Sequence, residues 1–209
     1  MKIPAPDLDR IVQNALLYAD PKAMRVREVL FDTPGNGNLY VYSFDDYVVV
    51  RDYAPYDLLL KKDPFSFSIE DVETLGTWIK MDKKVVHKYE ITIIPKMTGL
   101  VFECDDTSSD EESDSIFVSY FDPSEVWDTI FETLDLDLDG FYAPDWAIRP
   151  ERLVKLARLK ADKEAPIVIR GVELKQKFLV QFKKGKSIVG AIMPVDQTYV
   201  DEDFLWKKQ

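Results

Sequence analysis

The order of predicted elements constrains this 209-residue chain more than any single motif does. A stretch with helical periodicity is followed by three strand-like stretches, and this set of four occurs three times along the sequence. A connector at 123–146 precedes the third set. One helix can cover one face of a three-stranded antiparallel sheet, and such sheets can join edge to edge. The repeat therefore predicts an α+β fold of helix-plus-meander units.

Three stretches have the spacing of an amphipathic helix: PAPDLDRIVQNALLYADP, SIEDVETLGTWIKMDKK and RPERLVKLARLK. The second begins at Ser68, with Asp71 three residues later, a pattern similar to a capping box. Pro150 lies in the first turn of the third, where its missing N–H costs no hydrogen bond. A shorter helix candidate, SEVWDTIFETL, begins at Ser124 in the connector.

The strand-like stretches fall into three groups. In the first, REVLFDT and NLYVYSFDDYVVVRDY flank PGNGN, which predicts a hairpin. The second contains YEITIIP, GLVFECD and SIFVSYF. The third contains PIVIRGV, KFLVQFK and SIVGAIMPV, with KKGK as a tight turn. Antiparallel meanders are the simplest arrangement for strands joined by such short connections.

Composition excludes several classes of function. A hydrophobic content of 46% predicts a folded protein, and a net charge of −11 counts against a surface that attracts nucleic acid everywhere. Cys104 is the single cysteine and His87 the single histidine, so internal disulfides and histidine-cluster metal sites are impossible. The sequence contains no phosphate-binding glycine loop, and we expect neither a signal peptide nor a membrane span. We expect a soluble cytoplasmic protein that is not an enzyme and has no cofactor.

The connector contains DLDLDG, which matches the first half of a calcium-binding EF-hand loop. Asp135, Asp137 and Asp139 have the spacing of loop positions 1, 3 and 5, and a glycine follows at position 6. Position 12, where the loop needs a bidentate glutamate, is Trp146, and Pro144 lies where the exiting helix should start. The pattern therefore favours a solvent-exposed linker over a calcium site.

The third set of elements resembles the last half-domain of bacterial and phage beta sliding clamps. RPERLVKLARLK, PIVIRGV and KFLVQFKKGKSIVGAIMPV follow the helix and strands of that family, whose final strand ends in a Met-Pro-Met type of sequence. The first set is similar to a clamp half-domain as well, with Asp45, Asp46 and Tyr47 at the family's characteristic strand end. The second set is similar in element order alone.

The resemblance implies clamp-like repeats and a domain division. We expect a clamp-like domain of two units at 1–122, a connector at 123–146, a third unit at 147–196 and a tail at 197–209. Rings of this family contain twelve units in two or three subunits. Three units per chain depart from that pattern, because four chains would be needed to close a ring.

Cations on the predicted helices are the candidate DNA-binding residues. In the third helix they recur three apart, opposite an expected buried face of Leu153, Leu156, Ala157 and Leu159, and the second helix adds a group at its end. Inner helices of clamps face the phosphate backbone in this way. The alternative is an ordinary solvated helix face. The candidates are Arg149, Arg152, Lys155, Arg158, Lys80, Lys83 and Lys84.

The resemblance also implies a partner site beside the final strand, where clamps accept short peptides. Met193, Pro194 and Val195 occupy the matching place, and the alternative is a closing core strand. In the tail, Phe204, Leu205 and Trp206 form an apolar cluster that we expect to dock in a groove of this chain or a partner.

The expected function is that of a non-catalytic processivity factor that tethers a replication protein, such as a DNA polymerase, to duplex DNA. A homo-oligomer is among the expected partners. The alternative is an acidic, clamp-derived protein that binds or inhibits a replication protein without encircling DNA.

Overall fold

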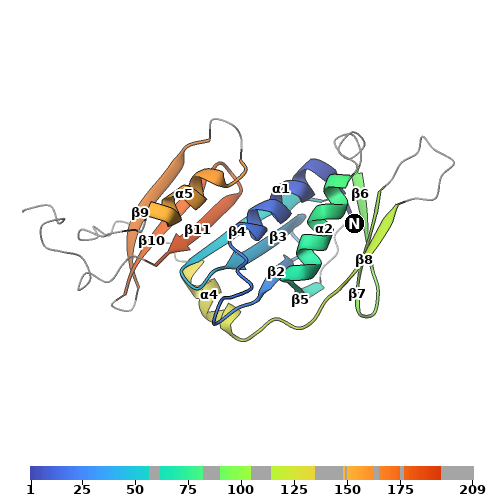
Figure 1. The fold of residues 1–209 in the computed structure, drawn as a ribbon, viewed down its shortest axis with the longest axis horizontal. Helices are drawn as coiled ribbons and strands as arrows, with labels where there is room; N and C mark the ends of the chain where they lie inside the picture. The colour runs from blue at the N-terminus through green and yellow to red at the C-terminus, as the bar shows by residue number, and fades with distance from the viewer. Residues whose placement is uncertain are drawn as a thin grey trace, which may run out of the picture.

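Figure 1 shows the computed structural model, which describes residues 1–56, 62–81, 90–104, 114–134, 148, 150–161, 165–174 and 177–193. The strands form an extended layer, and helices lie on one face of it. In chain order the elements of the first two units are β1 (Lys2–Pro4), α1 (Ala5–Leu16), β2 (Glu28–Thr33), β3 (Asn38–Phe44), β4 (Val48–Pro55), β5 (Lys62–Ser68), α2 (Ile69–Met81), β6 (Glu90–Pro95), β7 (Gly99–Cys104) and β8 (Ser115–Ser119). They are followed by α4 (Val126–Leu134), α5 (Pro150–Arg158), β9 (Ile167–Leu174), β10 (Lys177–Lys184) and β11 (Ile188–Ile192).

The predicted repeat of one helix and three strands is present in all three units. The first two units are also joined by two strands that the sequence analysis did not anticipate. β1 of the first unit pairs with β6 of the second, and β5, which leads into α2, pairs with β2 of the first. One sheet therefore has the order β1-β6-β7-β8, and the other contains β5-β2-β3-β4. This exchange of strands joins the first two units.

The core that these two units share lies between α1, α2 and the two sheets. Buried side chains of α1 and α2 pack against residues of both sheets, including Phe31 and Phe102. Gly76 lets α2 approach α1 closely, because a Cβ at this position would lie 3.3 Å from Val12 Cγ1. The predicted capping box at the start of α2 is confirmed, since the Asp71 N–H donates to Ser68 Oγ at 3.0 Å.

The third unit continues the second sheet. β11 pairs antiparallel with β4, which extends the order to β5-β2-β3-β4-β11-β10-β9. Gly190 lies at this seam opposite Val50, and a Cβ there would lie 2.4 Å from Val49 O. The first and third units share a hydrophobic core beneath α5, and we call this contact between the two units the joint. The core consists of Tyr18, Val48, Val50, Leu156, Leu159, Val180, Phe182, Ile188 and Ile192. The expectation that units join edge to edge is confirmed at this seam.

The short connector helix α4 packs against the same sheet in a separate cluster with Val49 and Ala191. Trp127 is buried there, and its Nε1–H donates to Glu28 Oε1 at 2.7 Å. The helix expected in this segment is therefore present, and it contributes to the core of the joint as well as linking units. The DLDLDG stretch lies outside the described residues, as does His87. No helix in the described ranges is long and apolar enough to cross a membrane.

Candidate functional site

The orientation of α5 differs from the one expected from its sequence. Its buried face is formed by Arg152, Leu156 and, just beyond the helix, Leu159. Leu153 and Val154, by contrast, are 41% and 52% exposed. The predicted division into a basic outer face and a leucine-rich inner face is therefore wrong in detail: the helix is rotated so that one arginine points inward.

Arg152 serves the joint between the first and third units. Its guanidinium donates to the main-chain oxygen of Met193 and lies 4.3 Å from the ring centroid of Tyr47. The Met193 N–H donates to the Tyr47 oxygen at 2.8 Å, so the end of β11 is tied to the β3–β4 turn. Because Arg152 is 8% exposed, we expect its main contribution to be packing and hydrogen bonding within the chain.

Lys155 also reaches the first unit. Its Nζ donates to Asp45 Oδ2 at 2.8 Å and lies 5.4 Å from the ring centroid of Tyr18. Burial raises the pKa of the Tyr18 phenol, and the nearby Asp45 carboxylate raises it further, so Tyr18 stays neutral. The Asp45-Asp46-Tyr47 turn, noted in the sequence for its similarity to clamps, is thus the platform on which α5 docks.

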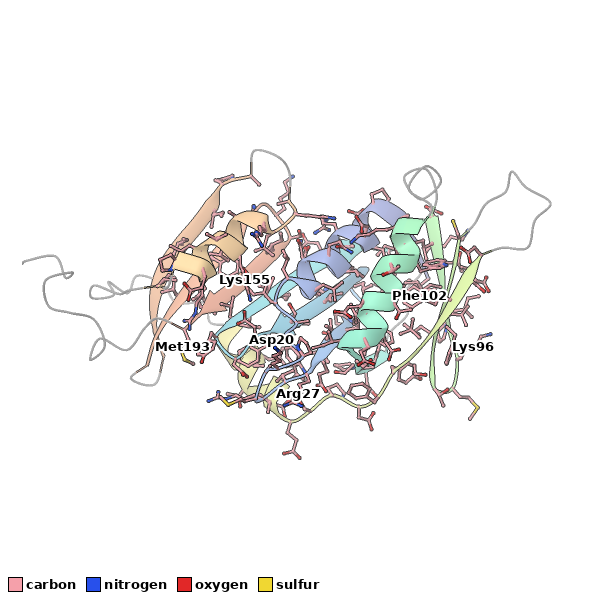
Figure 2. All side chains as sticks on the ribbon, viewed as in Figure 1. Asp20, Arg27, Lys96, Phe102, Lys155 and Met193 are labelled. Atoms are coloured by element: carbon pink, nitrogen blue, oxygen red, sulfur yellow. The ribbon has the colours of Figure 1, made fainter. Side chains whose placement is uncertain are left out.

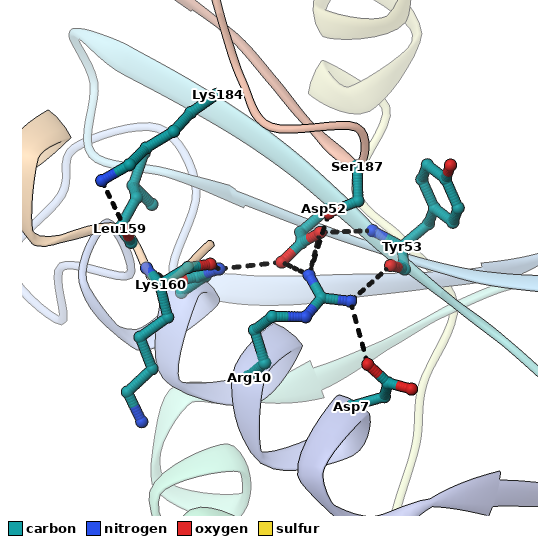
Figure 3. A network of polar contacts seen from close by, with 9 residues as sticks. Asp7, Arg10, Asp52, Tyr53, Leu159, Lys160, Lys184 and Ser187 are labelled. Atoms are coloured by element: carbon teal, nitrogen blue, oxygen red, sulfur yellow. Dashed lines mark hydrogen bonds and ion pairs between the residues drawn. The ribbon is translucent and has the colours of Figure 1, made fainter. Parts of the chain in front are cut away.

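A second polar network joins α1 to the third unit (Figure 3). Asp52, on β4, is buried and accepts hydrogen bonds from Arg10 Nη1 at 2.5 Å and Asn14 Nδ2 at 2.8 Å. Arg10 also donates to Ser187 Oγ at 3.0 Å. Asn14 both donates to and accepts from the backbone of Lys160. These contacts fix the third unit against the first through side chains as well as through the sheet.

Lys184 makes hydrogen bonds inside the third unit. Its Nζ donates to the main-chain oxygens of Leu159 at 2.7 Å and Ala157 at 3.1 Å, which are among the unpaired carbonyls at the end of α5. Burial lowers the pKa of the Lys184 ammonium. This lysine therefore caps a helix.

The remaining described cations of the candidate DNA-binding set lie on the exposed helical side. Arg158 is exposed on α5, and Lys80 is exposed on α2, where it donates to Gln13 Oε1 at 2.6 Å. Lys160, which was not predicted, is also exposed beyond α5 and pairs with Asp9 at 3.2 Å. Arg149, Lys83 and Lys84 lie outside the described residues. The structure thus divides the described candidate DNA-binding residues into two groups. Arg152 and Lys155 contact the first unit, whereas Arg158 and Lys80 are exposed.

Charge is distributed unevenly among the units. Residues 62–122 carry six Lys or Arg and fourteen Asp or Glu, a formal charge of −8. Residues 147–196 carry twelve Lys or Arg and five Asp or Glu, a formal charge of +7. Figure 2 shows how far apart the two charged ends lie, with Lys155 near α5 and Lys96 at the opposite end. The chain as a whole has a negative net charge, but its third unit is therefore basic.

Of the candidate partner residues, the structure describes Met193, which is partly exposed at the end of β11. Pro194, Val195, Phe204, Leu205 and Trp206 lie outside the described residues. The sheet of the third unit carries a shallow hollow of about 180 Å³ lined by Val168, Gln181, Phe182, Lys183 and Val189. Among the residues with described positions, no group of three or more His, Cys, Asp or Glu is placed to hold a metal ion.

The architecture of this chain is similar to that of proteins of known structure. No family model and no curated protein sequence matches the chain. The whole chain nevertheless superposes on the DNA polymerase III subunit beta of Pseudomonas aeruginosa, with a TM-score of 0.64, 11% identity and 68% of that chain covered. The Helicobacter pylori beta clamp bound to a DNA ligase peptide gives a TM-score of 0.62 at 10% identity, with 70% of that chain covered. The resemblance found in the sequence is confirmed as one of fold: the chain has a fold similar to that of bacterial beta sliding clamps.

Proposed function

We propose that this chain is a non-catalytic processivity factor that holds a replication protein, such as a DNA polymerase, on duplex DNA. The observation that carries the proposal is the placement of α1, α2 and α5 on one face of a layer with the sliding-clamp fold. Such a face can follow the phosphate backbone without reading bases. The basic third unit supplies the electrostatic attraction that the rest of the chain lacks.

The exposed cations are the residues to test. Changing Arg152 and Lys155 would break the joint, so loss of binding in such variants would not identify a DNA contact. Arg158 and Lys80 are exposed and lie on the helical side. A double variant, Arg158→Glu with Lys80→Glu, should weaken duplex binding and reduce its salt dependence. Each lost phosphate contact lowers the slope of log K against log salt by about 0.9.

The matched control is Lys96→Glu, which makes the same charge change in the exposed β6–β7 turn. Because Lys96 is far from α5, this variant should bind duplex DNA as the unchanged protein does. Equal loss of affinity in the control and the double variant would show that net charge alone governs binding. Full binding in the double variant would remove the proposed contact surface.

The partner site remains part of the proposal. The Helicobacter pylori beta clamp of the comparison is bound to a DNA ligase peptide, which supports a peptide as the partner class. Met193→Glu should then weaken such binding while leaving DNA affinity unchanged. The second candidate, an acidic interaction protein that does not hold DNA, is favoured by one observation: α2 exposes Glu70 and Glu73. A chain that binds replication proteins but no duplex would support it.

A further inference from the structure

Three segments that are far apart in the sequence meet at one exposed patch. The Met24 N–H donates to Asp46 Oδ2 at 2.6 Å, which ties the loop after α1 to the β3–β4 turn. The Met193 N–H donates to the Tyr47 oxygen of the same turn at 2.8 Å, which adds the end of β11. The exposed apolar side chains of this region form what we call the methionine patch: Met24, Tyr47 and Met193, which are 82%, 48% and 42% exposed. Exposed apolar side chains gathered in one place mark a site of contact.

The methionine patch is bordered by positive charge. Residues 20–27, in the loop between α1 and β2, carry three Lys or Arg and one Asp, a formal charge of +2. The three cations are all exposed: Lys22, Arg25 and Arg27. The carboxylates of the adjoining turn already accept hydrogen bonds, Asp45 from Lys155 Nζ at 2.8 Å and Asp46 from the Arg25 N–H at 3.1 Å. The patch therefore suits a segment that combines acidic with aromatic side chains, since thioethers and guanidinium groups both contact aromatic rings favourably.

The tail of this chain has that composition. Residues 197–206 read QTYVDEDFLW, with three acidic residues and no Lys or Arg, and the acidic run comes directly before the apolar cluster. The tail begins four residues after Met193, which is itself a member of the methionine patch. Phe204 follows Met193 by 11 residues. A stretch of that length can extend to about 36–40 Å, which is enough for the chain to turn back across the patch.

We propose that the tail docks on the methionine patch of its own chain. Phe204, Leu205 and Trp206 cover the exposed methionines, and the acidic run lies against the basic loop at 20–27. The short connection favours the chain's own tail over any free peptide, because it gives the tail an effective concentration of about a millimolar. This inference deepens the proposed function and rests on it for its consequence. Met193 belongs to the proposed partner site, so the tail occupies that site until a partner peptide displaces it.

Disulfide trapping in the full chain tests this contact without DNA or a partner. In a Cys104→Ser background, Leu205→Cys is combined with Met24→Cys and treated with oxidised glutathione. The matched control combines Leu205→Cys with Met97→Cys, in the exposed β6–β7 turn at the opposite end of the molecule (Figure 1). The pair at 24 and 205 should form an intrachain disulfide about tenfold faster than the control pair, because docking raises the local concentration of the two thiols.

Charge reversal separates docking from random encounter. Lys22→Glu with Arg25→Glu should slow the disulfide between positions 24 and 205 about fourfold, since each exposed ion pair contributes a factor of about two. Adding Asp201→Lys and Asp203→Lys should restore the rate. A loop that serves only to stabilise the fold would give no such rescue. Circular dichroism melting of each variant checks that the fold is kept.

A fluorescent peptide with the sequence of residues 197–209 tests the competition directly. By anisotropy, it should bind a full chain that carries Phe204→Ala and Trp206→Ala about tenfold more tightly than it binds the unchanged chain. The reason is that the unchanged tail already occupies the methionine patch, whereas the altered tail leaves it open.

Several results would overturn the inference. They are equal rates for the pairs that contain positions 24 and 97, disulfides between chains instead of within them, and equal peptide affinity for the altered and unchanged chains. A charge reversal that leaves the rate unchanged, or that the exchanged tail does not restore, would also overturn it. None of these measurements contains DNA, so failure of tail docking is distinguishable from failure of the proposed function, which duplex binding measures separately.

Discussion

Removal of the Asp52 carboxylate is the sharpest test of how the third unit is held. Asp52→Ala leaves the Arg10 guanidinium without its closest anion and the buried Asn14 amide without one acceptor. Removing one member of a buried ion pair typically costs about 3–5 kcal/mol, since the other charge remains uncompensated. Arg10 keeps Tyr53 O and Ser187 Oγ as acceptors. We therefore expect a loss of about 3 kcal/mol in the free energy of unfolding.

Urea unfolding gives this loss, and hydrogen exchange shows where it falls. Amides of β10 and β11 should lose protection, while those of β6 and β7 should change little. Asp7→Ala is the control: Asp7 also pairs with Arg10, but at 3.6 Å and with 36% of its side chain exposed. An exposed pair of this kind contributes about 0.2–1 kcal/mol. If Asp52→Ala costs no more than Asp7→Ala, the polar network does not hold the joint.

Three further changes test other parts of the account. Gly190→Ala should expose β11 to hydrogen exchange, because the added Cβ would lie 2.4 Å from Val49 O; unchanged protection would contradict the close approach. Burial raises the pKa of the Asp32 carboxyl above its ordinary value of 3.8. The free energy that this carboxyl contributes to folding is therefore present at pH values below 3.8 and is lost as the pH rises through the raised pKa of the folded state. Asp32→Asn should therefore gain stability relative to the unchanged protein as pH rises from about 4 to 7, and thermal melts with no such gain would show that burial of this carboxyl has little effect. Deleting 197–209 should change either the melting temperature or the assembled mass; if both persist, and every partner still binds, the tail does not dock.

Most of the fold could be predicted from local patterns. The helices have clear apolar spacing, and Gly35, Gly37 and Gly185 adopt the positive φ that the PGNGN and KKGK turns require. β1 and β5 could not be found in this way. β1 has three residues, and β5 contains Pro64, which counts against a strand assignment. Their role is visible once the two units are seen to exchange strands.

The candidate site was harder to predict because α5 is basic on more than one side. Periodicity alone could not show that Arg152 points inward, since its partners are a main-chain oxygen and a tyrosine ring far away in sequence. Leu153, expected on the buried face opposite the cations, is partly exposed. The contrast in charge between the second and third units was present in the sequence, and a count by unit instead of by chain would have shown it.

Binding of duplex DNA across a range of salt concentrations tests the central claim most directly. The measurement compares two unrelated duplexes of equal length, by fluorescence anisotropy, with the full chain. The account predicts equal affinities for the two sequences and a steep linear fall of log K with log salt, to which Arg158 and Lys80 each contribute about 0.9 in slope. No binding at low salt, or a clear preference for one sequence, would contradict a clamp-like protein that follows the DNA backbone.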